Sequence, residues 1–169
     1  SVKPQPIINI TNNAQTICNG TAMAGMTISN ANIPALTGTS YSWTRTNTNL
    51  TGTGATNLTG TNYTTNPINA GTLTHIPGST TTQTAIFTVT ATNVNGCSNT
   101  ATASVTVYAP LTVPVIGIPQ QVCNTQTPAI IYMTTAVSGG SGTYSYQWQR
   151  TNTPATPASW TNVPTAGTG

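Results

Sequence analysis

A short aromatic motif occurs twice in this chain of 169 residues, and its two copies lie 105 residues apart. The first copy is Tyr41-Ser-Trp-Thr-Arg-Thr-Asn-Thr48, and the second is Tyr146-Gln-Trp-Gln-Arg-Thr-Asn-Thr153. Cys18 and Cys123 have the same separation, so each motif tryptophan follows its cysteine by 25 residues. Two kinds of landmark with one common offset indicate a repeated structural unit of about 105 residues.

The apolar residues alternate with polar ones in several short stretches, and turn residues separate these stretches. This pattern predicts β-strands and an all-β sandwich. A tryptophan in an alternating strand, at a fixed distance after a cysteine, is typical of the third strand of an immunoglobulin-like sandwich. From residue 48 to residue 74 we expect loops and short, poorly specified strands. The residues expected to alternate on inward faces are Ile8, Ile10, Ala24, Met26, Ile28, Tyr41, Trp43, Arg45, Phe87, Val89, Ala91, Ala101, Ala103, Val105 and Val107.

The offset also predicts how the chain divides. Residues 1–109 are interpreted as one complete sandwich, residues 110–114 as a linker, and residues 115–169 as the N-terminal half of a second repeat. The counterparts of Phe87 to Val107 would fall near positions 192 to 212, beyond Gly169. Because half a sandwich has an open face and unpaired strand edges, we expect the second unit not to be stable alone.

Charged residues are almost absent from the chain. An average domain of this length would carry roughly 40 of them, whereas this sequence has three lysines and arginines and no acid. These three cations are not clustered, so the sequence excludes the basic surface that nucleic-acid binding needs. No apolar run approaches the roughly 18 residues of a membrane span, and no signal peptide is visible at the start of the sequence.

The lack of carboxylates also argues against catalysis and metal binding. Glycoside hydrolysis uses two carboxylates, and a Ser-His-Asp triad needs its aspartate. Calcium prefers carboxylate oxygens, and zinc sites need more His and Cys at close spacing than this chain offers. The single histidine, His75, is interpreted as a surface or strand residue. We therefore predict a protein that is not an enzyme and holds no cofactor and no metal.

Three cysteines in an acid-free, Thr-rich chain suggest an extracellular protein. We predict a disulfide between Cys18 and Cys97, which would close a loop of 79 residues and contribute about 4.5 kcal/mol in the chain-entropy description. Cys123 corresponds to Cys18, so its own partner would lie near position 202, past the end of the sequence. A reactive thiol and an intermolecular bridge are the alternatives for Cys123.

Trp43 and Trp148 are predicted to be core residues of their respective units. Arg45 and Arg150 share the face of these tryptophans, and with no acid to pair they are expected to extend to the sandwich rim or bind backbone carbonyls. A cation–π contact and a role in binding a ligand anion are alternatives. Trp160 is expected to pack in a hairpin, with glycan binding as the alternative.

Several of these motifs together resemble a known group of proteins. Ile17-Cys-Asn-Gly-Thr21, Tyr41-Ser-Trp43, the stretch from Phe87 to Cys97 and Tyr146-Gln-Trp-Gln-Arg150 resemble the PKD-like and Ig-like tandem repeats of secreted Bacteroidota surface proteins. The resemblance implies tandem β-sandwiches from very long adhesins of the type exported by the type IX secretion system, including those used in gliding motility. This chain departs from such repeats in lacking acids entirely.

The expectation from sequence is therefore a non-enzymatic structural or adhesive repeat of a long extracellular surface adhesin or filament. Its expected partners are neighbouring repeats or copies of the same protein, with surface glycans as a further option. One alternative is a fibre subunit whose incomplete second unit is completed by a strand from the next copy. The other is a carbohydrate-binding module, suggested by Trp160 and the polar surface.

Overall fold

The computed structural model describes residues 2–52, 64, 66–153 and 159–163, and the regular elements named in it are all β-strands. We call residues 2–109 the first half and residues 110–163 the second half. The strands of the first half are β1 (Ile8–Ile10), β2 (Ala14–Ile17), β3 (Ala22–Met23), β4 (Ile28–Asn30), β5 (Ser40–Thr46), β6 (Leu50–Gly52), β7 (Gly71–His75), β8 (Gln83–Thr92) and β9 (Ser98–Val107). Those of the second half are β10 (Val115–Ile116), β11 (Met133–Thr135), β12 (Gln149–Arg150) and β13 (Thr161–Asn162). The predicted all-β class is confirmed.

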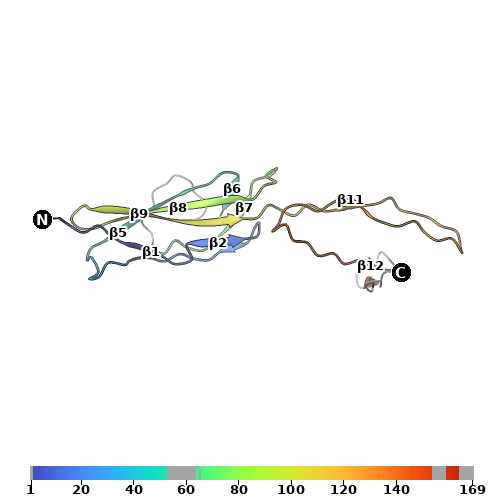
Figure 1. Cartoon of the computed structure of the whole chain (residues 1–169), viewed down its shortest axis with the longest axis horizontal. Helices are drawn as coiled ribbons and strands as arrows, with labels where there is room; N and C mark the ends of the chain where they lie inside the picture. Colours follow the sequence, from blue (N-terminus) through green and yellow to red (C-terminus); the bar gives the residue numbers. More distant parts are fainter. Residues whose placement is uncertain (1, 53–63, 65, 154–158, 164–169) are drawn as a thin grey trace.

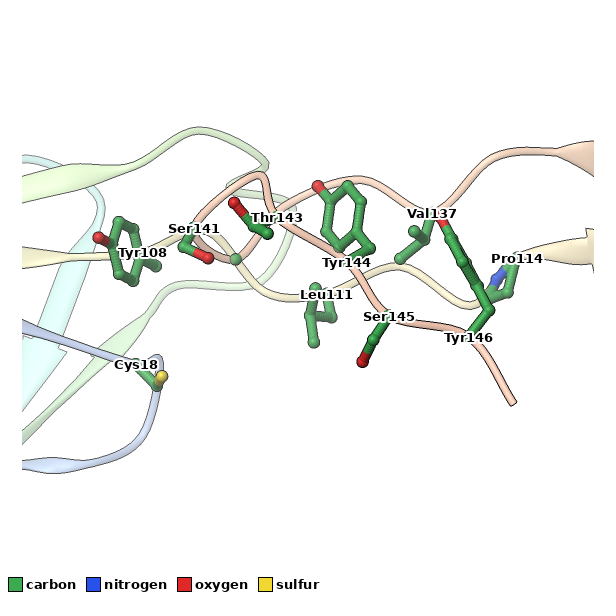
Figure 2. A pocket seen from close by; sticks show the side chains of 11 residues that line it. Cys18, Tyr108, Leu111, Pro114, Val137, Ser141, Thr143, Tyr144, Ser145 and Tyr146 are labelled. Atoms are coloured by element: carbon green, nitrogen blue, oxygen red, sulfur yellow. The ribbon is translucent and has the colours of Figure 1, made fainter. Parts of the chain in front are cut away.

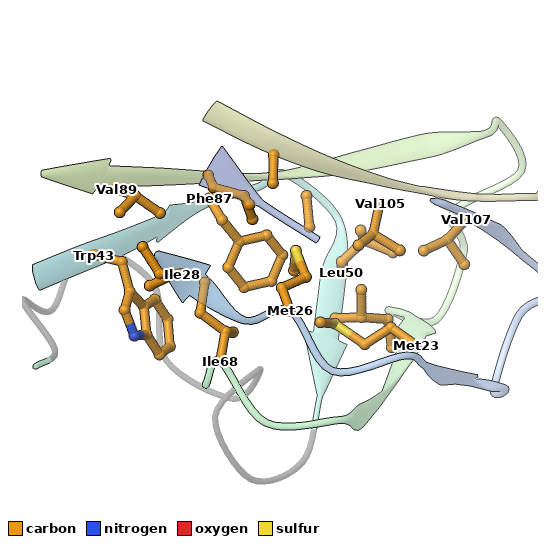
Figure 3. Close-up of a cluster of buried hydrophobic side chains, with 14 residues drawn as sticks. Met23, Met26, Ile28, Trp43, Leu50, Ile68, Phe87, Val89, Val105 and Val107 are labelled. Atoms are coloured by element: carbon orange, nitrogen blue, oxygen red, sulfur yellow. The ribbon is translucent and has the colours of Figure 1, made fainter. Parts of the chain in front are cut away.

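The first half consists of strands that enclose one apolar core. A four-stranded sheet has the order β2-β9-β8-β5, a three-stranded sheet has the order β3-β7-β6, and β1 pairs with β4. Buried residues from all of these sheets meet in the interior, as Figure 3 shows for Trp43, Phe87 and Leu50. Figure 1 shows this half as an elongated body, with the N-terminus at one end and the second half beyond the other.

The long strands β8 and β9 follow the predicted alternation. In β8 the side chains of Ala85, Phe87, Val89 and Ala91 are fully buried, while Ile86, Thr88 and Thr90 between them are not. Ala103, Val105 and Val107 form the matching row on β9. A strand with one apolar row and one mainly hydroxyl-bearing row buries its apolar face, which explains why the sequence predicted this sheet well.

One predicted row is wrong at its first position. The residues from Ala24 to Ile28 do not form a single strand, because the chain changes its partner strand here. Before Ala24, β3 pairs with β7, and from Ile28 on, β4 pairs with β1. Ala24 lies exposed at this change of sheet, and Met23 is buried in its place. The side chain of Gln15 replaces the missing strand: its Nε2 donates to the Ala24 carbonyl (3.0 Å), and its Oε1 accepts from the Ala24 N–H (2.7 Å).

The stretch from residue 48 to residue 74 contributes more core than its composition predicted. Leu50, Ile68 and Leu73 are buried in it, and β6 and β7 pair with each other. Asn66 also holds the adjacent backbone, since its side chain both accepts from and donates to the backbone of Ile28. Residues 53–63 and 65 of this stretch lie outside the described part of the chain.

The second half contains two separate strand pairs, β10 with β11 and β12 with β13. Its apolar side chains are largely exposed, and the prediction that Trp148 is a core residue is wrong: 47% of Trp148 is accessible, against 1% of Trp43. Trp43 lies in one buried cluster with Ile28, Ile68 and Phe87, and its strand β5 pairs with β8, whereas among the described residues β12, the strand next to Trp148, pairs with β13 alone (Figure 3).

The predicted linker, residues 110–114, is held by the segment that precedes the second aromatic motif. The N–H of Thr112 donates to the Ser138 carbonyl (3.0 Å), and the N–H of Gly140 donates to the Ala109 carbonyl (2.8 Å). Gly139 has a φ of +89°, and a Cβ at this position would overlap the carbonyl oxygen of Pro110. A glycine is thus required where the two backbones approach each other.

Candidate functional site

The site best defined by the structure is the pair of strands β2 and β9, at the start and the end of the first half. They run parallel, with Ala14 opposite Ser104 and Ile17 opposite Val107. The N–H of Ser104 donates to the Asn13 carbonyl (2.8 Å), and the N–H of Tyr108 donates to the Ile17 carbonyl (3.0 Å). We call this arrangement the terminal strand pair. It connects the segment where the chain enters the sandwich to the segment where it leaves.

His75 fixes the outer end of the terminal strand pair. Its side chain is 6% exposed on β7, and Nε2 lies 3.2 Å from the Val107 carbonyl while Nδ1 lies 2.9 Å from the Ser79 hydroxyl. Because a carbonyl only accepts, Nε2 carries a proton and donates it. The side chain of Asn19 accepts from the His75 N–H (2.8 Å). The expectation of a strand residue is correct, and its neighbours explain why a histidine stands there.

The three cysteines do not meet, and the predicted Cys18–Cys97 disulfide is wrong. All three are free thiols. Cys18 follows β2, whose last residue, Ile17, lies opposite Val107 at the end of β9, whereas Cys97 precedes the first residue of β9. Ten strand residues span about 30 Å, and a disulfide requires Cα atoms within about 7 Å of each other. Sequence reasoning failed because the parallel pairing of β2 with β9 places the two cysteines at opposite ends.

This correction can be checked by counting thiols. We expect all three cysteines to react with an alkylating reagent without prior reduction, with exposed Cys18 and Cys123 reacting faster than half-buried Cys97. Mass spectrometry of the labelled chain gives the count and the order. A peptide in which Cys18 is joined to Cys97 would restore the predicted pairing and contradict the strand register described above.

The two arginines of the repeated motif lie in different surroundings. Arg45 is 1% exposed on β5, opposite Phe87, so it does not extend to the rim, which was the first of the two placements expected for it. Arg150, its counterpart on β12, is exposed. On the same face as Arg45, burial raises the pKa of the Tyr41 phenol above its usual value. The face is therefore a packing surface in the first half and an open one in the second.

The 105-residue offset reappears in the local hydrogen bonding of the two halves. Gln120 holds Ala129 with bonds of 3.1 Å and 2.7 Å, as Gln15 holds Ala24. The turn after each cysteine closes in the same way, with Thr21 N–H donating to Cys18 and Gln126 N–H to Cys123. Gly20 and its counterpart Thr125 both have a φ of 74°. The second half thus repeats this amide clamp and this turn of the first half.

An open cleft of about 500 Å³ lies where the first half meets the second. Figure 2 shows Cys18 and Tyr108 on one side of it, with Leu111 and Tyr144 further along the chain. The described residues that line it carry no charged side chain. The Tyr144 hydroxyl donates to the Gly139 carbonyl (2.6 Å), so this tyrosine stabilises the junction.

The described residues contain no group of three or more His, Cys, Asp and Glu side chains that could hold a metal ion. The same part of the chain has no helix with the length and hydropathy needed to cross a bilayer. Trp160, which adjoins β13 in the hairpin with β12, is 43% exposed. Comparison of the chain with protein-family models, with curated proteins and with solved structures gives no match.

Proposed function

We propose that this chain is a non-enzymatic, load-bearing repeat of a long extracellular surface adhesin or filament. The observation that carries the proposal is the terminal strand pair. The chain enters the sandwich through β1 and β2 and leaves it after Val107, and these points lie toward opposite ends of the first half (Figure 1). Tension between neighbouring repeats would therefore pull β2 and β9 in opposite directions along their length.

This direction of loading matters because it decides how the hydrogen bonds break. When strands are pulled along their axes, the four residue pairs of β2 and β9 carry the load together. When strands are peeled apart, the bonds break one after another at lower force. β1 pairs with β4 over three residues, so its release would transfer the load to the terminal strand pair. Forced unfolding depends on the rate of barrier crossing, which such a pair slows.

The composition and the resemblance described above support the non-enzymatic and extracellular parts of the proposal. With no Asp or Glu and one His, whose ring bonds Val107 and Ser79, the chain lacks the usual acid–base pairs of hydrolases. Thr, Asn and Ser side chains interact with water without charge. The extracellular assignment no longer draws on a disulfide, since the cysteines are apart.

Single-molecule pulling on the full chain, held at its two ends, tests the proposal. The carbonyls of Asn13 and Ile17 face β9, so by strand alternation the backbone of Gln15 faces β9 and that of Thr16 faces away. Replacing Gln15 with proline removes one N–H from the pair and leaves its acceptor unpaired, at a cost of about 3 kcal/mol. At a given force we expect the first half of Gln15→Pro to unfold roughly a hundredfold faster.

Two control variants isolate the effect of the strand pair. Thr16→Pro places the ring on the edge of β2 that is away from β9, and Gln15→Ala removes only the side-chain bonds to Asn12 and Ala24. Both should keep an unfolding force closer to that of the unaltered chain. Equal unfolding forces for Gln15→Pro, Thr16→Pro and the unaltered chain would show that β2 and β9 do not carry the load.

A further inference from the structure

The outer face of the four-stranded sheet carries hydroxyl side chains in a regular array. The register of β5, β8 and β9 sets them in ranks that run across the three strands. Ser42 lies opposite Thr90, and Thr90 lies opposite Thr100. The neighbouring rank is built in the same way from threonines alone. We call the six residues of these two ranks the hydroxyl array: Ser42, Thr90, Thr100, Thr44, Thr88 and Thr102.

Strand alternation explains why the hydroxyl array faces outward. Between its two ranks, Trp43 and Val89 are buried, and Ala101 packs against the same core. The six members of the array all remain at least partly exposed. Within the described residues their hydroxyls make no hydrogen bond to another protein group, so each of them is available to a ligand. The array lies wholly in the first half, and its register and exposure do not depend on the second.

The outer face of the sheet is uncharged and has no aromatic side chain. The whole chain has no acid, and the one cation of the four strands, Arg45, is buried on the opposite face of β5. The aromatic residues of these strands, Tyr41, Trp43 and Phe87, belong to the inner row. A charged ligand would therefore find no counter-charge here, and a sugar ring would find no aromatic ring to stack on.

The spacing of the hydroxyl array is that of the sheet itself. Neighbouring strands lie about 4.8 Å apart, and alternate residues of one strand lie about 6.8 Å apart. On the prism faces of hexagonal ice, oxygen atoms repeat at distances close to both of these values. Threonine is branched at Cβ, which restricts its χ1 rotation, so its hydroxyl and methyl groups keep the spacing. Because sheet twist rotates every further strand, the match is restricted to three neighbouring strands.

We propose that the hydroxyl array is an ice-binding site, whose ligand is the ordered water at an ice surface. Each hydroxyl both donates and accepts, as a water molecule of the lattice does. The absence of charge matters, since a charged side chain would orient its own hydration water and disturb that lattice. The proposal concerns one face of the first half and does not depend on the load-bearing role.

Partial freezing of a dilute solution of the full chain tests the proposal. Slowly growing ice takes up proteins that bind it and rejects other solutes, so we expect the chain to be enriched in the ice relative to serum albumin. Thr88→Tyr raises a ring above the centre of the array and keeps both ranks from a flat surface. Because it disturbs a central contact, it should lower the enrichment by about tenfold or more.

The matched control makes the same change in the other sheet. Thr51 is an exposed threonine of β6 in the three-stranded sheet, and Thr51→Tyr should change the enrichment by less than about twofold. Tyrosine is favoured in strands, so both variants should keep the fold, which circular dichroism checks. If Thr88→Tyr does not fold, Thr102→Tyr makes the same change at an exposed member of the same rank. A single ice crystal grown in the unaltered protein should also develop flat prism faces.

Each other outcome overturns the proposal. Exclusion of the chain from ice to the same extent as albumin would show that the hydroxyl array does not bind ice. Equal enrichment of Thr88→Tyr and Thr51→Tyr would place the ice contact elsewhere on the protein. Retention on crystalline cellulose that Thr88→Tyr abolishes, without enrichment in ice, would identify a polysaccharide lattice as the ligand. Since no force is applied in these measurements, their failure leaves the load-bearing role to its own test.

Discussion

Replacing Trp43 with alanine is expected to lower the free energy of unfolding of the first half by about 3–5 kcal/mol. The side chain is 1% exposed and packs against Phe87, the one phenylalanine of the chain. Its removal leaves a cavity that short strands around it can fill only in part. Because the whole stability of a domain is about 5–15 kcal/mol, the variant should be close to unfolded at room temperature.

The repeated motif supplies a matched control for this substitution. Trp148→Ala changes the same residue type in nearly the same local sequence, at a position that is 47% exposed. We expect its effect on the same transition to be within about 0.5 kcal/mol. Urea unfolding followed by far-ultraviolet circular dichroism compares both variants with the unaltered chain. Equal losses would contradict the difference in burial between the two halves.

A less severe variant keeps the test informative if Trp43→Ala does not fold. Trp43→Phe retains an aromatic ring and should cost about half as much, because fewer buried atoms are removed. A loss that increases from phenylalanine to alanine would indicate a packing role for Trp43. A loss confined to the alanine variant would show that the core tolerates the smaller ring.

Replacing Asn93 with alanine is expected to cost about 3 kcal/mol, from three hydrogen bonds of roughly 1 kcal/mol each. The side chain is 5% exposed. Its Nδ2 donates to the Pro4 carbonyl (2.8 Å), and its Oδ1 accepts from the N–H groups of Asn95 (2.9 Å) and Cys97 (3.1 Å). One amide thus closes the turn between β8 and β9 and attaches the N-terminal segment to it.

The control for this variant lies two residues further along the same turn. Asn95 is exposed, so Asn95→Ala should change the unfolding free energy by no more than about 0.5 kcal/mol. Asn93→Ala should also make residues 2–6 more susceptible to proteolysis, since the segment would lose its bond at Pro4 and keep those that Asn32 donates to Gln5 and Asn99 donates to Pro6. Unchanged stability and unchanged cleavage would refute this role of Asn93.

Bonds of this kind explain how an acid-free chain holds its irregular segments. The side chains of Gln15, Asn32, Asn66 and Gln120 each bond the backbone as a neighbouring strand would. An amide has both a donor and an acceptor, so one side chain can satisfy an N–H and a C=O together. These contacts hold irregular segments of the backbone in a chain whose three cysteines are free thiols.

Periodicity predicted the regular part of the fold and little of the irregular part. The rows on β8 and β9 and the burial of Trp43 follow from alternation, which each strand expresses locally. The short strands β3, β6 and β7 are too brief for a period to be visible. The bonds from His75 to Val107 and from Asn93 to Pro4 join residues 32 and 89 positions apart, and strand alternation gives no signal for either bond.

The sequence by itself determined the all-β class, the period of 105 residues and the inward rows of the long strands. All three follow from the spacing of residue types along the chain. Only the tertiary structure decided that β2 pairs in parallel with β9 and that Cys18 and Cys97 lie at opposite ends of it. It also decided that two nearly identical motifs hold one buried and one exposed tryptophan. The burial of a residue depends on which other strands pack against it, and the sequence of one strand does not specify those strands.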